Sequence, residues 1–274
     1  MDSALDWHGA KALLEWYVEL GASDAVGEGA VNRYDLPEAA PKLAAAPAPG
    51  PENPDASPSQ NAPVPHSPVE AAANHAAEAR RLAQTAPDLA ALAEALRDFD
   101  GLELKKGARN FVFADGNPAA RVMIVGEAPG ADEDRIGRPF VGRAGQLLDR
   151  MFAAIGLSRD APAANDAFYI TNVLPWRPPA NRTPSPQEAG LMLPFLERHI
   201  ALVNPQVLVL MGNTPCGALL GRTGILRMRG NWKEALGKPA LPMTHPAYLL
   251  RSPAAKREAW ADLLSIQAKL RETP

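Results

Sequence analysis

The sequence predicts an α/β fold of three layers, α/β/α, with a central four-stranded parallel sheet. Two observations predict this class. Short apolar runs, typical of buried strands, occur at residues 122–125, 168–174, 207–211 and 240–244. Helical patterns of apolar residues lie between them, at about residues 142–156, 186–202 and 213–220, and a further one closes the chain at 253–270. Strands that alternate with helices favour a parallel sheet covered on both faces.

The composition is that of a globular protein with an additional segment. The chain has 274 residues, of which 46% are hydrophobic, and this suffices for a sizeable core. No run approaches the ~18 consecutive apolar residues of a membrane span, so we expect a cytoplasmic protein with no membrane partner. Cys216 is the single cysteine, which excludes an internal disulfide framework. We expect it to be a small buried residue near a helix start.

The charge is distributed unevenly along the chain. Residues 1–100 hold 6 Lys and Arg against 16 Asp and Glu, a net −10, whereas residues 101–274 hold 22 against 15, a net +7. A basic globular domain is typical of nucleic-acid-binding proteins. Charge alone is equally compatible with an ordinary solvated surface.

The N-terminal part divides into three segments by composition. Residues 1–36 are expected to be a short acidic helical segment, because the stretch 11–20 has apolar residues at helical spacing. Residues 37–68 contain ten of the 28 prolines, and we expect a flexible Pro/Ala-rich linker there. Residues 69–98 are expected to form a helical lead-in to the main domain, residues 99–274.

The most informative stretch runs from Arg121 to Leu148. Its apolar beginning, VMIV, is typical of a strand, and the following GEAPG contains two glycines and a proline that preclude further strand or helix. A helix pattern starts near Gly142. A strand, a Gly-rich loop with an acidic residue and a helix are the usual parts of a ligand site at the carboxyl edge of an open α/β sheet.

Polar residues follow three of the predicted strands. Glu127 follows the first strand, Asn172 ends the second, and the turn Thr244-His245-Pro246 follows the fourth. The carboxyl ends of parallel strands meet at one edge of the sheet. We therefore expect these groups to converge, although they lie far apart in the sequence.

Three longer segments resemble the signatures of a known family. GEAPGADEDRIGRPFVGRAGQLLDRM, TNVLPWRPPANRTPSPQE and HPAYLLR are similar, in this order, to the signature segments of family 4 uracil-DNA glycosylases. The resemblance covers roughly residues 99–270. It implies a uracil-DNA glycosylase-like catalytic domain over residues 99–274 and uracil-containing DNA as the partner. The implied activity is that of a monofunctional glycosylase of base-excision repair, which flips uracil out of DNA and hydrolyses its N-glycosidic bond to leave an abasic site.

The resemblance assigns the chemistry to His245 and Glu127. As the glycosidic bond breaks, uracil takes up negative charge and the sugar becomes cation-like, so groups aimed at these charges supply most of the catalysis. The resemblance implies that His245 donates a hydrogen bond to uracil O2. Glu127 would orient a water towards the sugar or hold negative charge near it, and both roles stay open.

Further motif residues are expected to bind the base. Asn172 offers an amide donor and acceptor, which suit O4 and N3–H of uracil and do not suit cytosine. Phe140 resembles the family's base-stacking aromatic residue. The ordinary alternatives are a turn-capping asparagine and a core phenylalanine. The expected uracil-binding set is Gly126, Ala128, Gly130, Asp132, Phe140 and Asn172.

DNA contacts are expected from the motif loops. Arginines there would contact phosphates, and Tyr248, Leu249 and Leu250 beside Arg251 form an apolar tip suited to wedge into the gap left by the flipped base. Any one of the arginines is equally compatible with a plain surface charge. The expected DNA-binding set is Arg138, Arg143, Arg182, Arg227, Arg229, Tyr248, Leu249 and Arg251.

The sequence departs from the family at the iron–sulfur cluster. Members of the family usually hold this cluster on four cysteines, and the corresponding positions here are the cysteine-free segment 99–105, Trp176 and Met192. We therefore expect no cluster, no other metal and no soluble cofactor. A packed hydrophobic plug is expected in the cluster's place.

Alternatives stay open for the activity and for the N-terminal arm. The missing cluster and the added arm are compatible with a uracil-DNA or abasic-site binding protein with little or no turnover. A nucleotide- or small-molecule-binding domain is less well supported, because GEAPG lacks the lysine and the Ser or Thr of a phosphate-binding loop. We expect a monomer. The acidic arm either binds a protein partner or folds over the basic face and competes with DNA.

Overall fold

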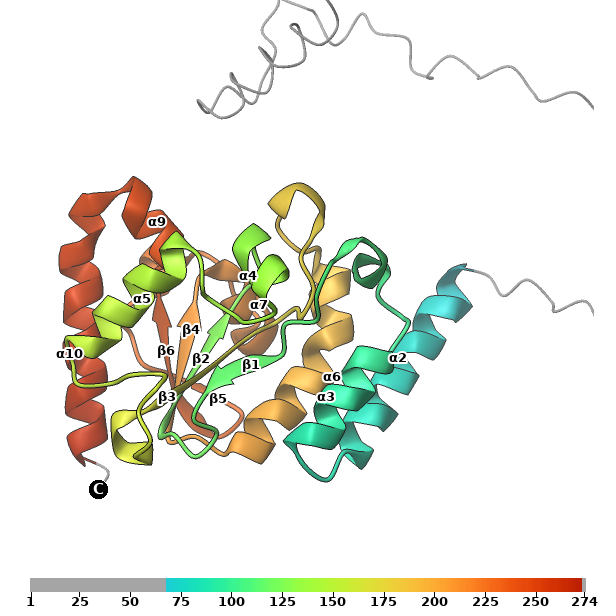
Figure 1. Cartoon of the computed structure of the whole chain (residues 1–274), viewed down its shortest axis with the longest axis horizontal. Helices are drawn as coiled ribbons and strands as arrows, with labels where there is room; N and C mark the ends of the chain where they lie inside the picture. Colours follow the sequence, from blue (N-terminus) through green and yellow to red (C-terminus); the bar gives the residue numbers. More distant parts are fainter. Residues whose placement is uncertain (1–67, 273–274) are drawn as a thin grey trace, which may run out of the picture. The chain divides into compact units, whose positions relative to one another are not determined.

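The computed structural model describes residues 68–272 and has the predicted α/β architecture (Figure 1). The segment predicted over residues 1–36 lies outside the described residues. The linker predicted over residues 37–68 also lies outside them, except for residue 68. Within the described range, no helix has the length and apolarity needed to span a membrane.

Six strands form one mixed sheet: β1 (Ala114–Gly116), β2 (Val122–Gly126), β3 (Phe168–Asn172), β4 (Val207–Met211), β5 (Lys233–Ala235) and β6 (Lys238–Met243). Their order is β1-β3-β2-β4-β6-β5. The four central strands are parallel and are the four predicted from the sequence. The antiparallel edge strands β1 and β5 were not predicted, because each has only three residues and neither forms an apolar run.

The α-helices are α2 (Pro68–Thr85), α3 (Leu89–Asp98), α4 (Ala131–Ile136), α5 (Arg143–Ala153), α6 (Pro186–Val203), α7 (Asn213–Leu220), α8 (Ile225–Met228), α9 (Pro246–Arg251) and α10 (Lys256–Glu272). Single 3₁₀ turns supplement them at η2 (Glu103–Gly107), η3 (Ala164–Asp166), η4 (Pro179–Asn181) and η5 (Pro253–Ala255). The predicted helices between the strands correspond to α5, α6 and α7, and the closing helix corresponds to η5 and α10.

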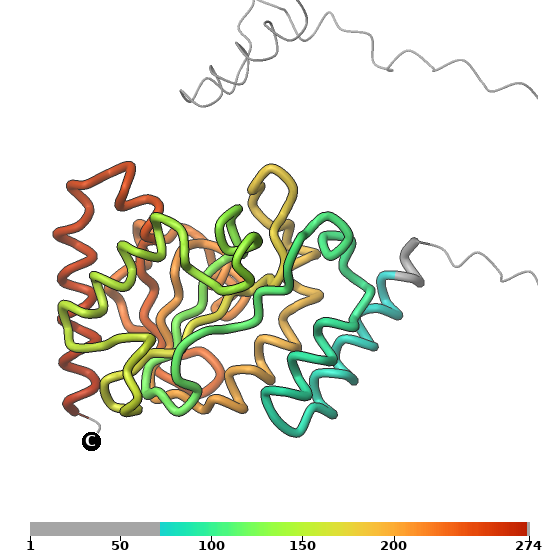
Figure 2. The backbone as a smooth tube through the Cα atoms, viewed as in Figure 1, coloured from blue at the N-terminus to red at the C-terminus, as the bar shows by residue number. Residues whose placement is uncertain are grey.

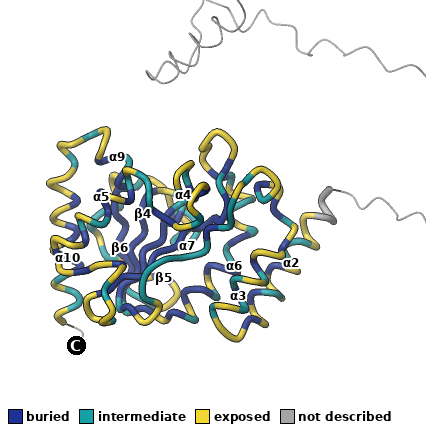
Figure 3. The backbone as a smooth tube through the Cα atoms, viewed as in Figure 1, coloured by how far each residue is buried: buried dark blue, intermediate teal, exposed yellow. Residues whose placement is uncertain are grey.

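Alternate residues of each central strand enter two different cores. In β2, Val122 and Ile124 pack with residues of α5 and α10, whereas Met123 and Val125 pack with residues of α6 and α7. This alternation follows from the two-residue period of a strand. Because helices cover both faces, β2, β3 and β4 are buried at every position (Figure 3). Burial on both sides explains why these strands appear in the sequence as continuous apolar runs.

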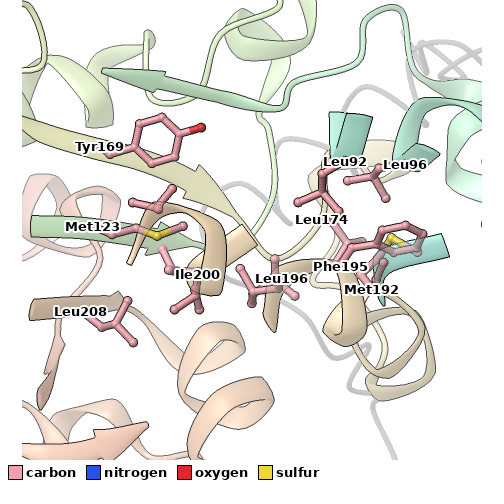
Figure 4. Packing of buried hydrophobic residues seen from close by; sticks show 14 of the residues in the cluster. Leu92, Leu96, Met123, Tyr169, Leu174, Met192, Phe195, Leu196, Ile200 and Leu208 are labelled. Atoms are coloured by element: carbon pink, nitrogen blue, oxygen red, sulfur yellow. The ribbon is translucent and has the colours of Figure 1, made fainter. Parts of the chain in front are cut away.

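The two N-terminal helices belong to the same folded unit as the sheet. Leu92 and Leu96 of α3 are part of one apolar cluster with Phe195 and Leu196 of α6 (Figure 4). Both α2 and α3 lie along α6, and the backbone trace shows them as neighbours beyond the α6 side of the sheet (Figure 2). The helical lead-in therefore contributes to the core.

The strand register aligns the predicted site residues. Gly126 at the end of β2 is paired in register with Asn172 at the end of β3, and Met211 at the end of β4 is paired with Met243 at the end of β6. The residues that follow these positions emerge at one edge of the sheet, where open α/β sheets bind their ligands.

Candidate functional site

A cleft of about 780 Å³ lies at the carboxyl edge of the parallel strands. Its walls come from the loop after β2, the segment before α5, the end of β3, the loop at η4, the start of α7, α8 and the turn into α9. The predicted site residues that line it are Glu127, Ala128, Gly130, Phe140, Asn172, Arg182, His245, Tyr248 and Arg251.

Asn172 lies in the cleft wall with unused hydrogen-bonding capacity. The residue is 7% exposed, and neither Oδ1 nor Nδ2 has a partner among the described residues. The hydroxyl of Thr244, which lines the same cleft, is also buried without a partner. Leaving such a group unsatisfied costs about 1–3 kcal/mol. Unsatisfied buried polar atoms in a cleft are expected where a ligand completes the hydrogen bonds.

Phe140 packs near the imidazole of His245 and lines the same cleft as Asn172. Its ring centroid is 5.4 Å from that of His245. A Cβ atom at residue 126 would lie 2.5 Å from the Phe140 ring and would also overlap the Asn172 side chain. Gly126 is not among the residues that line the cleft. Its lack of a side chain lets Phe140 and Asn172 pack against the backbone of β2.

His245 precedes α9 and has a defined tautomer. The backbone N–H of Ala247 donates to Nδ1 at 3.2 Å, so Nδ1 is an acceptor and the ring hydrogen resides on Nε2. Burial, and to a smaller extent the positive charge of Arg251, lower the pKa of His245 to about 4, although Glu133 has the opposite effect. At neutral pH the ring is therefore uncharged and offers one N–H.

Glu127 is held by a residue that the sequence analysis missed. The hydroxyl of Thr214, in the first turn of α7, donates to Glu127 Oε2 at 2.5 Å. Thr214 follows β4 closely, as Glu127 follows β2. The rule that polar residues after strand ends converge would therefore have found it.

Two other predicted residues lie away from the cleft lining. Asp132 is exposed and forms an ion pair with Arg135 at 3.2 Å. Leu249 was predicted to contact DNA, and the structure corrects this, because its side chain is fully buried in a cluster with Leu147. Leu250, the next residue, is 36% exposed and is the apolar side chain available at this tip.

Three of the six predicted arginines are held by carboxylates, in the pairs Arg138–Asp115, Arg182–Glu188 and Arg229–Asp262. Asp262 of α10 is buried, so its pair with Arg229 fastens the residues after α8 to the C-terminal helix. Arg229 thus makes a structural contact, and its DNA contact stays a prediction. Arg143, Arg227 and Arg251 are exposed and have no ion-pair partner in the described part of the chain.

The positions that the resemblance assigns to cluster cysteines do not fit an iron–sulfur cluster. Trp176 and Met192 are buried apolar side chains, and the ring of Phe99 packs 5.5 Å from that of Phe195. Figure 4 shows Met192 and Phe195 among leucines of α3 and α6. None of these residues supplies the thiolate that such clusters require. Cys216 lies in α7, where burial raises the pKa of its thiol to about 12.

An open sheet of mainly parallel strands, with a polar cleft at their carboxyl ends, defines an α/β protein that binds its ligand at this edge. Residues 113–264 match the sequence model of the uracil DNA glycosylase superfamily, and the chain belongs to this superfamily. It is similar to the type-4 uracil-DNA glycosylase of Thermotoga maritima, with 42% identity over 52% of this chain and 73% of the relative. The type-4 uracil-DNA glycosylase of Pyrobaculum aerophilum is 38% identical over 64% of this chain and 91% of the relative. That of Archaeoglobus fulgidus is 39% identical over 60% of this chain and 84% of the relative.

Proposed function

We propose that this chain is a monofunctional uracil-DNA glycosylase, which takes a flipped uracil into the cleft and hydrolyses its N-glycosidic bond. The observation that carries the proposal is the buried, unpartnered amide of Asn172 beside Phe140 and His245. Uracil has a flat face for Phe140 and a polar edge that satisfies both atoms of the amide. The superfamily membership and the type-4 relatives support uracil in DNA as the substrate.

His245 stabilises the charge that develops on the base. When the bond between C1′ and N1 breaks, its electron pair stays with uracil, and negative charge accumulates on O2. The Nε2–H of a neutral, pre-oriented imidazole donates to this oxygen. A donor placed in this way accelerates such reactions by about 10²- to 10³-fold.

Glu127 acts on the sugar side of the same bond. The hydrogen bond from Thr214 fixes its carboxylate at the cleft, where its negative charge favours the cation-like sugar. The same carboxylate orients a water molecule, whose oxygen forms the new bond to C1′. The water loses a proton to the solvent, and the uracil anion takes up a proton from it. The products are an abasic site and free uracil.

The surroundings of the cleft suit the DNA backbone. Arg143, Arg227 and Arg251 are exposed and unpaired in the described part of the chain, so their charges are available to phosphates. We also propose that no iron–sulfur cluster takes part, because buried apolar side chains occupy the positions of Trp176 and Met192. We propose the same for a metal ion, because no group of three or more His, Cys, Asp or Glu residues in the described part of the chain could hold one.

The proposal is tested by base release from an end-labelled oligonucleotide that carries one uracil, with alkaline cleavage of the abasic sites. We expect cleavage by the full chain and a loss of about 10²- to 10³-fold in His245→Ala. His75→Ala is the matched control, since His75 lies in α2 outside the cleft, and it should retain the rate. Binding of uracil-containing DNA without base release would favour the alternative, a lesion-binding protein.

A further inference from the structure

Phe140 has a backbone conformation that needs support from its neighbours. Its φ angle is 52°, in the left-handed region that residues with a Cβ atom rarely adopt. Such a conformation persists only where the surrounding structure determines it. Because Phe140 carries the ring that faces the base, whatever holds its backbone also sets the plane on which the base stacks.

Arg159, in the connection between α5 and β3, holds the carbonyl side of Phe140. Its side chain is 6% exposed. Nη1 donates to the carbonyl oxygen of Pro139 and Nη2 to that of Phe140, both at 2.9 Å. Nη1 also donates to Asp115 at 2.9 Å, while Nε and Nη2 contact Asp149 at 2.9 and 2.8 Å. All three guanidinium nitrogens are therefore engaged within the protein, through four hydrogen bonds and an ion-pair contact with Asp149.

Glu133, in α4, holds the N–H groups of the two residues that follow Phe140. Its Oε1 accepts hydrogen bonds from the backbone N–H groups of Val141 and Gly142, both at 2.9 Å. Its Oε2 accepts from the N–H of Gly130 at 3.1 Å. A cation therefore binds the carbonyl groups at and before Phe140, and an anion binds the N–H groups after it. Each charge matches the sign of the peptide dipole that it meets.

Packing restricts Phe140 in the remaining directions. A Cβ atom at residue 145 would overlap the carbonyl oxygen of Phe140, so the first turn of α5 lies directly against this peptide group. A Cβ atom at residue 126 would in turn overlap the ring, so the backbone of β2 lies directly against it. The backbone and the ring are thus both fixed before any ligand arrives.

Folding stability alone does not explain the buried ionic network around Arg159. Burial raises the pKa of Asp115, but the hydrogen bonds and charges of Arg159 and Arg138 outweigh this effect, and the pKa lies below its ordinary value. The carboxylate therefore stays ionised at neutral pH. Buried ionic groups often contribute less to stability than apolar residues of similar size. A positioning role explains why the Arg159 guanidinium donates to the backbone carbonyl groups of Pro139 and Phe140.

We propose that Arg159 and Glu133 are positioning residues that fix Phe140 in the orientation that stacks on the flipped base. Arg159 acts on the carbonyl groups of Pro139 and Phe140, and Glu133 acts on the N–H groups of the two residues that follow Phe140. Arg159 does not line the cleft and acts only through Phe140. This inference rests on the proposed function, because stacking on uracil is part of that function.

A double-mutant cycle in the full chain tests the inference. The variants are Arg159→Lys, Phe140→Ala and the combination, and the measurement is the single-turnover rate of uracil release. A lysine cannot reach two carbonyls and two carboxylates at once, so Arg159→Lys should slow release by about 10- to 100-fold. In the Phe140→Ala background the same change should leave the rate within about twofold. Affinity for undamaged DNA should stay unchanged in both backgrounds.

Arg198→Lys is the matched control, because the Arg198 guanidinium also donates to a backbone carbonyl, that of Ala86, away from the cleft. Equal slowing by Arg159→Lys in both backgrounds, or slowing no greater than in the control, would overturn the inference. If Arg159→Lys does not fold, Asp149→Asn, which removes a carboxylate that holds Arg159 and does not line the cleft, enters the cycle and should show the same dependence on Phe140.

If the unmodified protein releases no uracil, the proposed function fails by that result alone. The cycle is then measured as the preference for uracil-containing over undamaged DNA. Additive losses of this preference, or no preference to lose, would overturn the positioning role as well.

Discussion

The buried amide of Asn172 lowers the stability of the fold and is available to bind a ligand in the cleft. Its amide is buried without a partner at the end of a fully buried strand, which is an unfavourable place for polar atoms. Core residues of this strand are otherwise apolar or hydrogen-bonded, as Thr171 is to the carbonyl oxygen of Phe113. The unsatisfied amide therefore marks the ligand site more specifically than the charge of the domain does.

Replacement of Asn172 by leucine should raise stability. Leucine has a similar volume and removes the unsatisfied donor and acceptor, so we expect the free energy of unfolding to increase by about 1 kcal/mol. Urea unfolding of the two proteins measures the difference. A decrease of similar size would show that the amide is satisfied in the folded protein.

Thr214 offers a test of how Glu127 is positioned. Thr214→Val keeps the shape of the side chain and removes the hydroxyl that donates to Glu127. We expect the single-turnover rate to fall about tenfold, with affinity for the DNA unchanged. Thr223→Val, at an exposed threonine outside the cleft, is the control. Equal rates for the two variants would show that Thr214 does not position Glu127 for the reaction.

At the scale of elements, the sequence contained strong signals for the central strands and for the helices between them. β2 and β4 are buried on both faces and therefore form apolar runs, and the predicted and observed bounds of α7 are the same, residues 213–220. The edge strands β1 and β5 have no such run. The roles of Arg159 and Glu133 depend on long-range contacts with one loop, which periodicity does not reveal.

The start of α6 should make stability depend on pH. The hydrogen bond from Arg182, followed by those from Ser185, lowers the pKa of Glu188 to about 2, although partial burial opposes this. In the unfolded chain the group titrates near 4.5. Because the folded pKa is depressed, the stabilisation is complete above the unfolded value and is lost as the pH falls from about 4.5 towards 2.

Glu188→Gln tests this linkage. The variant should be less stable than the unmodified protein at neutral pH, and its free energy of unfolding should fall less between about pH 5 and pH 2. Urea unfolding at several pH values measures both effects. Glu94→Gln, at an exposed glutamate in α3, should keep the original slope. If the free energy of unfolding of Glu188→Gln depends on pH as strongly as that of the unmodified protein, the assigned pKa shift is contradicted.

At the scale of the whole molecule, the charge asymmetry should appear in DNA binding. The part of the chain after residue 100 has a net charge of +7, and Arg227 and Arg251 are exposed beside the cleft. A phosphate contact releases counterions, so Arg251→Gln should reduce the slope of log affinity against log salt by about 1. Arg80→Gln, at an exposed arginine of α2, is the control. An unchanged slope for Arg251→Gln would exclude its phosphate contact.

The central claim is that the cleft binds uracil through Asn172 and releases it from DNA. Mass-spectrometric detection of free uracil from an oligonucleotide with one deoxyuridine tests this claim most directly, with Asn172→Leu measured beside the unmodified protein. We predict release by the unmodified protein and a rate lower by about 10²- to 10³-fold in the variant. Absence of free uracil from the unmodified protein, or equal rates for the two, would contradict the claim.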